Sequence, residues 1–161
     1  ISDFGLARQL GISRKEAARY IELYFMRYPG VHTYLKGCVE RAKQQGAATT
    51  LFGRRREMPE LKSSNYNTRS FGERVAMNMP IQGTAADIIK LAMVRVYNEL
   101  KARGMKSELI LQIHDELIID AVQEEADAAA EILKSCMENV VNLKVPLLAE
   151  VHTGHSWFDT K

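Results

Sequence analysis

The segment ELILQIHDELIIDAV, residues 108–122, constrains the fold of this chain more than any other. Two apolar runs with many branched side chains, residues 109–113 and 117–119, are typical of strands and too short for helices. Only His114, Asp115 and Glu116 separate them, so the chain has little room in which to reverse direction. We therefore expect a tight antiparallel hairpin with these three polar residues at its tip.

The polar residues of this hairpin tip have two interpretations. In most proteins, His, Asp and Glu in a turn are polar turn residues and nothing more. The flanking runs predict buried strands, however, and two adjacent carboxylates at their junction would repel each other unless a cation lay nearby. Carboxylate oxygens suit Mg²⁺ or Mn²⁺. A metal needs more ligands than one hairpin tip supplies, so this second interpretation requires ligands from elsewhere.

Helical patterns fill the first part of the chain. Ser13 and Glu16 have the spacing of a capping box, and apolar residues then recur at helical spacing until Pro29. A second amphipathic stretch runs from residue 31 to near residue 46. The opening ISDFGLAR contains the Asp-Phe-Gly signature of protein kinases. Two capped helices in place of a mobile activation loop exclude that class, and Asp3 is expected to be a surface or capping residue.

A basic run follows these helices. In ATTLFGRRREMPEL, residues 48–61, we expect a strand over residues 49–52, with Gly53 ending it. Arg54, Arg55 and Arg56, the arginine triplet, either decorate a solvated turn or clamp phosphate groups, because guanidinium groups pair well with phosphate oxygens. Residues 62–70 are rich in Ser and Asn and predict a surface loop at a subdomain boundary.

Residues 71–100 predict a helix that is interrupted at Pro80 and resumes with Thr84 as a new N-cap. Arg74, Asn78 and Gln82, the donor row, follow one another at intervals of four. They form either the polar face of a surface helix or a set of hydrogen-bond donors for the DNA minor groove. The second alternative is attractive because purine N3 and pyrimidine O2 accept hydrogen bonds at every base pair.

The segment after the hairpin predicts a helix over residues 124–141 and a final strand over residues 147–151. The expected fold class is therefore α+β, with an antiparallel sheet backed by helices. Cys38 and Cys136 lie in apolar helical patterns without metal-ligand spacing, which favours reduced thiols and a cytoplasmic location. No apolar run is long enough to cross a membrane, so no membrane partner is expected.

Charge divides unevenly along the chain. Residues 1–70 carry 13 Lys and Arg against 6 Asp and Glu, whereas residues 71–161 carry 9 against 14. A basic half joined to an acidic half suggests a polyanion bound on one side and cations on the other. Two solvated surfaces of opposite sign would explain the same numbers.

Three motifs in order resemble family A DNA polymerase, the bacterial DNA polymerase I type. They are TLFGRRR, ERVAMNMPIQGTAAD and QIHDELI, and Trp157 follows near the end. The resemblance spans essentially all 161 residues. It implies a fragment of a right-hand polymerase, in which residues 1–70 are the C-terminal part of the fingers and residues 71–161 the C-terminal part of the palm.

The resemblance also implies roles for individual residues. Asp115 would bind the catalytic metals, with Glu116 as a supporting carboxylate and His114 beside the primer terminus. The donor row, Arg74, Asn78 and Gln82, would face the minor groove of the primer–template. Arg54, Arg55 and Arg56 would supply DNA contacts, and the sequence leaves open which of them does so.

The activity implied is two-metal phosphoryl transfer from a deoxynucleoside triphosphate (dNTP) to a primer 3′-hydroxyl, with two Mg²⁺ ions or Mn²⁺ in their place. Primer–template DNA and dNTP would be the partners, in a cytoplasmic, nucleoid-associated protein. The family's other essential Asp and its nucleotide-gripping helix are expected upstream of Ile1, and its thumb elsewhere in the parent. The remainder of the polymerase chain is thus a further expected partner, and the fragment alone is expected to be inactive.

Two other function classes compete with polymerase activity. One is a non-catalytic DNA-binding fragment, which would share the basic residues and the donor row but not the metals. The other is a metal-dependent phosphohydrolase, since His-Asp pairs also serve such enzymes. It is the weaker alternative, because His32, His152 and His155 do not complete an obvious ligand set.

Overall fold

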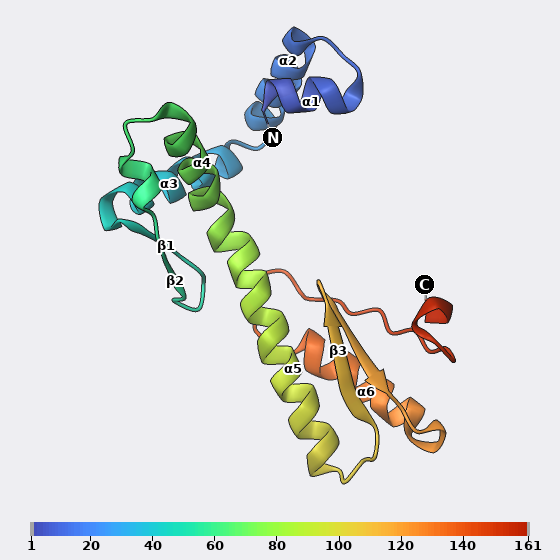
Figure 1. Cartoon of the computed structure of the whole chain (residues 1–161). Coiled ribbons are helices and arrows are strands. Elements are labelled where there is room, and N and C mark those ends of the chain that lie inside the picture. Colours follow the sequence, from blue (N-terminus) through green and yellow to red (C-terminus); the bar gives the residue numbers. More distant parts are fainter. Residues whose placement is uncertain (1, 161) are drawn as a thin grey trace. The chain divides into compact units, whose positions relative to one another are not determined.

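The computed structural model of the chain describes residues 2–160, which divide into two compact units at residues 81 and 82. Each unit has its own apolar core. Helices dominate the first unit, whereas the second combines two helices with a β-hairpin (Figure 1). The α+β class predicted from the sequence is confirmed, with two separate two-stranded antiparallel sheets.

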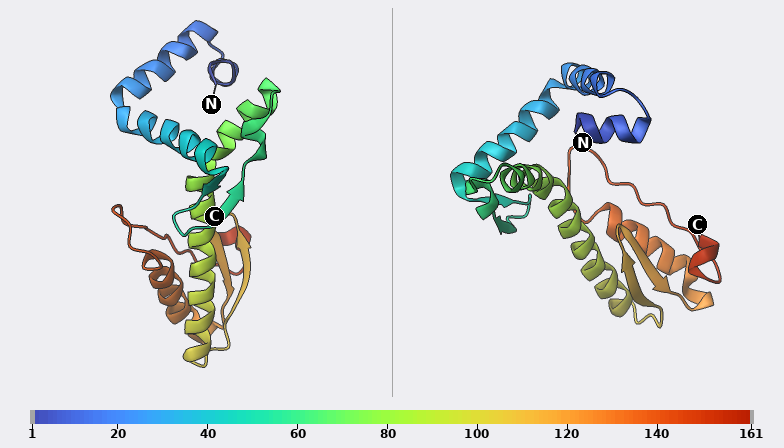
Figure 2. Two further views of the ribbon diagram at one scale, coloured as in Figure 1. Left: turned by 90° about the vertical axis from the view of Figure 1, so that its left-hand side faces the viewer. Right: turned by 45° about the horizontal axis from the view of Figure 1, so that its top comes forward.

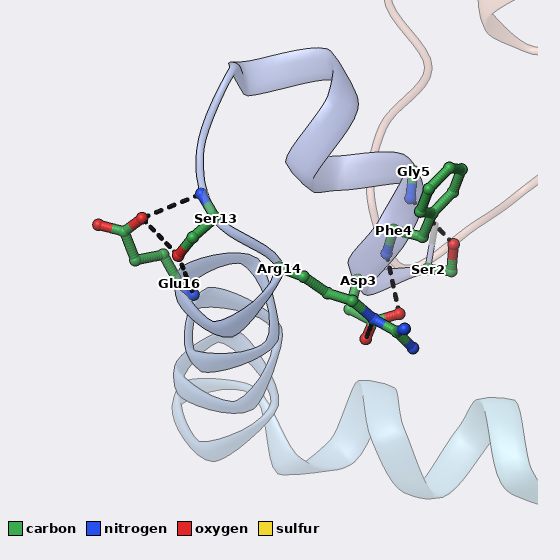
Figure 3. A network of polar contacts seen from close by, with 7 residues as sticks. All are labelled: Ser2, Asp3, Phe4, Gly5, Ser13, Arg14 and Glu16. Carbon is green, nitrogen blue, oxygen red and sulfur yellow. Dashed lines mark hydrogen bonds and ion pairs between the residues drawn. The ribbon is translucent and has the colours of Figure 1, made fainter.

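Two short helices open the first unit, α1 (Asp3–Leu10) and α2 (Arg14–Arg27). The predicted capping box is present: the Ser13 hydroxyl accepts from the Glu16 amide, and the Glu16 carboxylate accepts from the Ser13 amide. Figure 3 shows how Asp3 joins the two helices, with its carboxylate 2.6 Å from Nε of Arg14. The hydrogen bond from Arg14 lowers the pKa of Asp3. This acid of the Asp-Phe-Gly tripeptide is thus an ion-pair partner, as expected for a surface residue.

One residue, Tyr28, separates the third helix, α3 (Pro29–Gln45), from α2. Pro29 therefore starts a helix as well as ending the previous one, because a proline in the first turn loses no hydrogen bond. Gly46 ends α3 with a φ of 69°, a left-handed conformation that favours glycine.

The first hairpin pairs β1 (Ala47–Thr49) with β2 (Arg55–Glu57). The strand predicted over residues 49–52 is wrong except at Thr49, because the next residues form the turn. The Thr50 carbonyl accepts from the Gly53 amide, and the Thr50 hydroxyl accepts from the Arg54 amide. Gly53 has a φ of 81°, which fits its place in this turn.

A short 3₁₀-helix, η1 (Pro59–Lys62), leads to α4 (Tyr66–Asn78). The predicted loop over residues 62–70 is therefore wrong beyond Asn65. The Asn65 side chain accepts hydrogen bonds from the amides of Asn67 and Thr68 and so caps α4. η1 and α4 approach so closely that a Cβ at Gly72 would lie 2.9 Å from Cβ of Glu60. The core of the first unit consists of Val39, Ala42, Ala48, Met58, Leu61 and Ala76.

The helical backbone does not break at Pro80. A π-helix, η2 (Met79–Gly83), connects α4 to α5 (Thr84–Ala102), and the residue before α5 is itself helical. The predicted N-cap at Thr84 is wrong for this reason: Thr84 is the first residue of α5, and the backbone before it is already helical. A π turn is one way for a helix to pass a residue that lacks an N–H group.

The second unit contains the predicted hairpin, formed by β3 (Glu108–Ile113) and β4 (Glu116–Asp120). A 3₁₀ turn, η3 (Gln123–Glu125), precedes α6 (Ala126–Glu138), which packs beside α5 (Figures 1 and 2). A last 3₁₀ turn, η4, spans Trp157–Thr160. The core is shared by α5, β4 and α6 and consists of Ile89, Ala92, Val96, Leu100, Leu117, Ala129, Ile132 and Cys136.

Two expectations about the second unit are wrong. Residues 147–151 form no strand, because within residues 2–160 the sheet of β3 and β4 has no third strand. The strands are also not buried on both faces: Leu117 faces the core, but Ile110 is 58% and Leu111 45% exposed. The hairpin thus presents an apolar surface that the described part of the chain covers only in part.

Both cysteines are free and buried, as expected for reduced thiols in helical cores. Cys38 belongs to α3 and Cys136 to α6. Among residues 2–160 we find no helix with both the length and the apolar character needed to span a membrane.

The two ends of the β3–β4 hairpin are tied together at its base. The Glu125 carboxylate accepts hydrogen bonds from the amides of Lys106 and Ser107 and from the Ser107 hydroxyl at 2.6 Å. The same hydroxyl accepts from the amide of Val122. These bonds, that of the Ser107 side chain first, lower the pKa of Glu125.

We predict that Glu125→Gln lowers the free energy of unfolding near neutral pH. The pKa of Glu125 is depressed in the folded state, so its stabilisation is present above the unfolded-state pKa and lost as pH falls through the folded-state pKa. Urea unfolding at about pH 7 and about pH 3 measures this. The gap between the wild-type chain and the variant should shrink at the lower pH, and an equal gap at both would contradict the assignment.

Candidate functional site

The hairpin tip brings His114, Asp115 and Glu116 together at one end of the second unit. Ile113 and Glu116 are the last paired residues, so His114 and Asp115 alone make the reversal. The side chains of all three tip residues are exposed. The tip is therefore an accessible edge at which a histidine and two carboxylates face solvent.

The backbone of the tip has an unusual conformation. His114 has a φ of 53°, and no other residue besides glycine has a positive φ in the described part of the chain. Two-residue hairpin turns that match the strand twist need a positive φ at the first central residue, a place usually taken by Gly or Asn. The Gln112 side chain donates a hydrogen bond of 2.8 Å to the His114 carbonyl and so spans this turn.

The carboxylates have the right chemistry for a hard cation but are too few to hold one alone. The side chains of Asp115 and Glu116 make no hydrogen bond or ion pair with any residue from 2 to 160, so their carboxylate oxygens are available to ligands. Magnesium requires an octahedral set of oxygen ligands. Within the described residues, however, no group of three or more His, Cys, Asp or Glu side chains could hold a metal ion.

The donor row lies on helical backbone. Arg74 and Asn78 are exposed on α4, and Gln82 is exposed in the π-helix η2. The Arg74 guanidinium donates to the Ser70 hydroxyl at 3.0 Å and lies over the Phe71 ring. A π turn contains more than four residues. Asn78 and Gln82 are four residues apart, so they are separated by less than one full turn here. A common function for these three residues stays a prediction.

The arginine triplet is exposed on the β1–β2 hairpin, but its members differ in their surroundings. Arg55 donates from Nε to Glu57 at 2.8 Å and from Nη2 to the carbonyl of Gln45, the last residue of α3, at 3.3 Å. Arg56 lies 3.9 Å from the Glu60 carboxylate. Arg54 lies in the turn before β2, and alternation along the strand places Arg55 and Arg56 on opposite faces. Arg55 thus has a structural task at the end of α3.

One residue of this site was missed by the sequence reasoning. Gln112 lies inside an apolar run, where a single polar residue predicts only a solvated strand position. A signal was available, because residues two apart in a strand share a face and Gln112 precedes His114 by two. The bond to the turn carbonyl depends on the turn conformation, which the spacing alone does not give.

Comparison with known proteins identifies the family. The family model described as DNA polymerase family A matches residues 1–159. The chain belongs to DNA polymerase family A. Its relatives include DNA polymerase I of Caldicellulosiruptor bescii, 55% identical over 161 residues, and DNA polymerase I of Bacillus caldotenax, 51% identical over 161 residues. The whole chain aligns in both cases but covers only 19% and 18% of these proteins.

A solved structure of this family has the same fold. The POL domain of Pol1 from M. smegmatis, determined in complex with DNA primer-template and dNTP, is 44% identical to the chain and superposes with a TM-score of 0.95. The match covers 99% of this chain and 28% of that one. The chain thus spans about a fifth of the curated family A relatives, and about a quarter of this polymerase domain.

Proposed function

We propose that this chain is part of a DNA-directed DNA polymerase and carries one side of its nucleotidyl-transfer site at the β3–β4 hairpin tip. The observation that carries the proposal is the pair of exposed carboxylates, Asp115 and Glu116, without protein partners at a two-residue turn of a family A chain. The M. smegmatis relative, solved with primer-template and dNTP, supports these two as the substrates.

In this proposal, the hairpin tip supplies a metal ligand and lies beside the primer. Asp115 binds Mg²⁺, with Glu116 as its support, and ligands from the rest of the parent chain complete the set. Two such ions, or Mn²⁺ in their place, would lower the pKa of the primer 3′-hydroxyl and stabilise the leaving pyrophosphate. His114 would contact the primer terminus, and the donors of Arg74, Asn78 and Gln82 would face the minor groove.

Residues 1–70 are proposed to belong to the fingers and residues 71–161 to the palm, in a cytoplasmic, nucleoid-associated enzyme. The rest of the polymerase chain is the partner proposed for the exposed apolar side of the hairpin. Ile110 and Leu111 line a groove of about 850 Å³ that β3, β4, α6 and residues 151–157 enclose. Such a surface on a hairpin is suited to burial against further protein.

A non-catalytic DNA-binding fragment is the second candidate, favoured by the basic and donor residues of the first unit. This second candidate requires no metal. The need for the carboxylates at the hairpin tip therefore distinguishes polymerase activity from DNA binding alone. A phosphohydrolase has no supporting observation, since the described residues contain no cluster of three metal-ligating side chains.

We predict that Asp115→Asn in the full-length polymerase reduces primer extension in Mg²⁺ by more than about a hundredfold, because even indirect support of a metal ligand contributes about that much. The variant keeps the size of the side chain at an exposed position, so its melting temperature and its affinity for duplex DNA should stay near those of the wild type. Extension at a rate close to the wild type would refute the metal-ligand role and leave the DNA-binding candidate.

The arginines should differ in their effect on the salt dependence of DNA binding. We expect Arg54→Ala/Arg56→Ala to reduce the slope of log K against log salt by about one for each arginine that contacts a phosphate. Arg55→Ala is the matched control. It should leave the slope unchanged and lower the stability of the chain, because Arg55 holds Glu57 and the end of α3. An unaltered slope in the double variant would assign Arg54 and Arg56 to a solvated surface.

The 161-residue chain by itself should incorporate no nucleotide. The hairpin tip supplies two carboxylates, which are too few to bind the metal ions. Phosphoryl transfer needs a complete set of metal ligands and a positioned triphosphate. A primer-extension assay on the purified chain tests this, with Asp115→Asn as the control for contaminating polymerase. Extension that disappears in the control would mean that the chain holds a complete site, contrary to the proposal.

A further inference from the structure

We propose that Glu60 limits the affinity of the polymerase for DNA, because its carboxylate attracts Arg56 and repels a phosphate group that approaches this arginine. This inference rests on the function proposed above, since it matters only if Arg56 contacts a phosphate. Glu60 lies in η1, which begins two residues after β2 ends. It would change the binding equilibrium without itself contacting DNA, nucleotide or metal.

Arg56 and Glu60 form an ion pair, but a loose one. Nη2 of Arg56 lies 3.9 Å from Oε1 of Glu60, which is too far for a hydrogen bond. No other acid lies within ion-pair distance of Arg56 among residues 2–160. An acid that fixed the guanidinium in one orientation would typically accept two short hydrogen bonds from it. Glu60 therefore attracts Arg56 without fixing its geometry, so it competes with a phosphate and does not prepare the arginine for one.

The carboxylate of Glu60 is unfavourable for the stability of the fold. Its Oε2 atom is buried and has no hydrogen-bond partner among residues 2–160. The stem of the side chain has little freedom to move, because a Cβ at Gly72 of α4 would lie 2.9 Å from Cβ of Glu60. An unpaired buried oxygen costs free energy, and the cost is larger for a charged group. A neutral side chain would favour folding at this position, so the negative charge points to a role outside stability.

The charge of Glu60 lies close to the place where a phosphate would bind. The Arg56 side chain is 47% exposed, so its guanidinium is open to a ligand while Glu60 lies on another side of it. A phosphate in contact with this guanidinium would lie within the screening length of about 10 Å from the Glu60 carboxylate at 0.1 M salt. The Glu60 side chain is only 24% exposed, whereas that of Glu57 is 71% exposed, so water screens Glu60 less. Repulsion between the carboxylate and the phosphate therefore weakens DNA binding at Arg56.

The test uses Glu60→Gln and Glu60→Ala in the full-length polymerase, since both remove the charge and they differ in size. Glu57→Gln is the matched control, because it removes the same charge from an acid three residues away that pairs with Arg55. Arg56→Ala and the double variant Glu60→Gln/Arg56→Ala complete a double-mutant cycle. The affinity for primer–template is measured without metal at about 0.1 M salt and at higher salt. The melting temperature of each variant shows that it is folded.

We expect both Glu60 variants to bind primer–template about two- to fivefold more tightly at low salt, which is the effect of one partly exposed ion pair. The gain should shrink at higher salt and vanish in the Arg56→Ala background, and Glu57→Gln should bind like the wild type. Unchanged or weakened binding in both Glu60 variants would overturn the inference, and so would an equal gain in the absence of Arg56. Failure of the proposed phosphate contact would show differently, as an Arg56→Ala polymerase with wild-type affinity.

Discussion

The pairing of Ile113 with Glu116 is the constraint on which the site of this chain depends. It leaves two residues for the reversal, and this requirement imposes a left-handed φ on His114 and exposes Asp115 and Glu116 at the tip. At the other end of the hairpin, the Glu125 carboxylate accepts hydrogen bonds from the backbone amides of Lys106 and Ser107, just before β3. Because Glu125 itself comes shortly after β4, these bonds tie the two ends of the hairpin together. Between these ends, Leu117 anchors β4 in the core of α5 and α6.

Local signals allowed the sequence to predict much of this fold. The capping box at Ser13 and Glu16 depends on residues three apart, and α6 depends on helical periodicity, so neither needs information from the rest of the chain. The hairpin was predictable because two short apolar runs with three residues between them can hardly form anything else. Errors came where one signal has two meanings. Asn65 is typical of loops, but it is also a favoured helix cap, and here it starts α4.

Other features could not be predicted because they depend on tertiary contacts or on exact geometry. A strand exists only with a partner, so the apolar pattern of residues 147–151 does not define one by itself. The continuation of the helix past Pro80 as a π turn is likewise a matter of exact backbone geometry, which the sequence pattern does not give. At the site, the sequence predicted that His114, Asp115 and Glu116 lie at the hairpin tip, and the structure places them there. The different tasks of Arg55 and Arg56 became visible only from their partners, Gln45 and Glu60.

The proposed function requires a catalytic metal ion at the hairpin tip, and metal-directed cleavage of the backbone tests for this ion. In the full-length polymerase bound to primer–template, Fe²⁺ in place of Mg²⁺ reacts with added hydrogen peroxide, is oxidised to Fe³⁺ and releases hydroxide and a short-lived hydroxyl radical, which cuts the polypeptide near the ion. Within this chain, we expect cuts only at residues 113–117, and we expect excess Mg²⁺ to suppress them and Asp115→Asn to abolish them. Cleavage of this chain elsewhere, or an undiminished cut in that variant, would contradict this position of the ion.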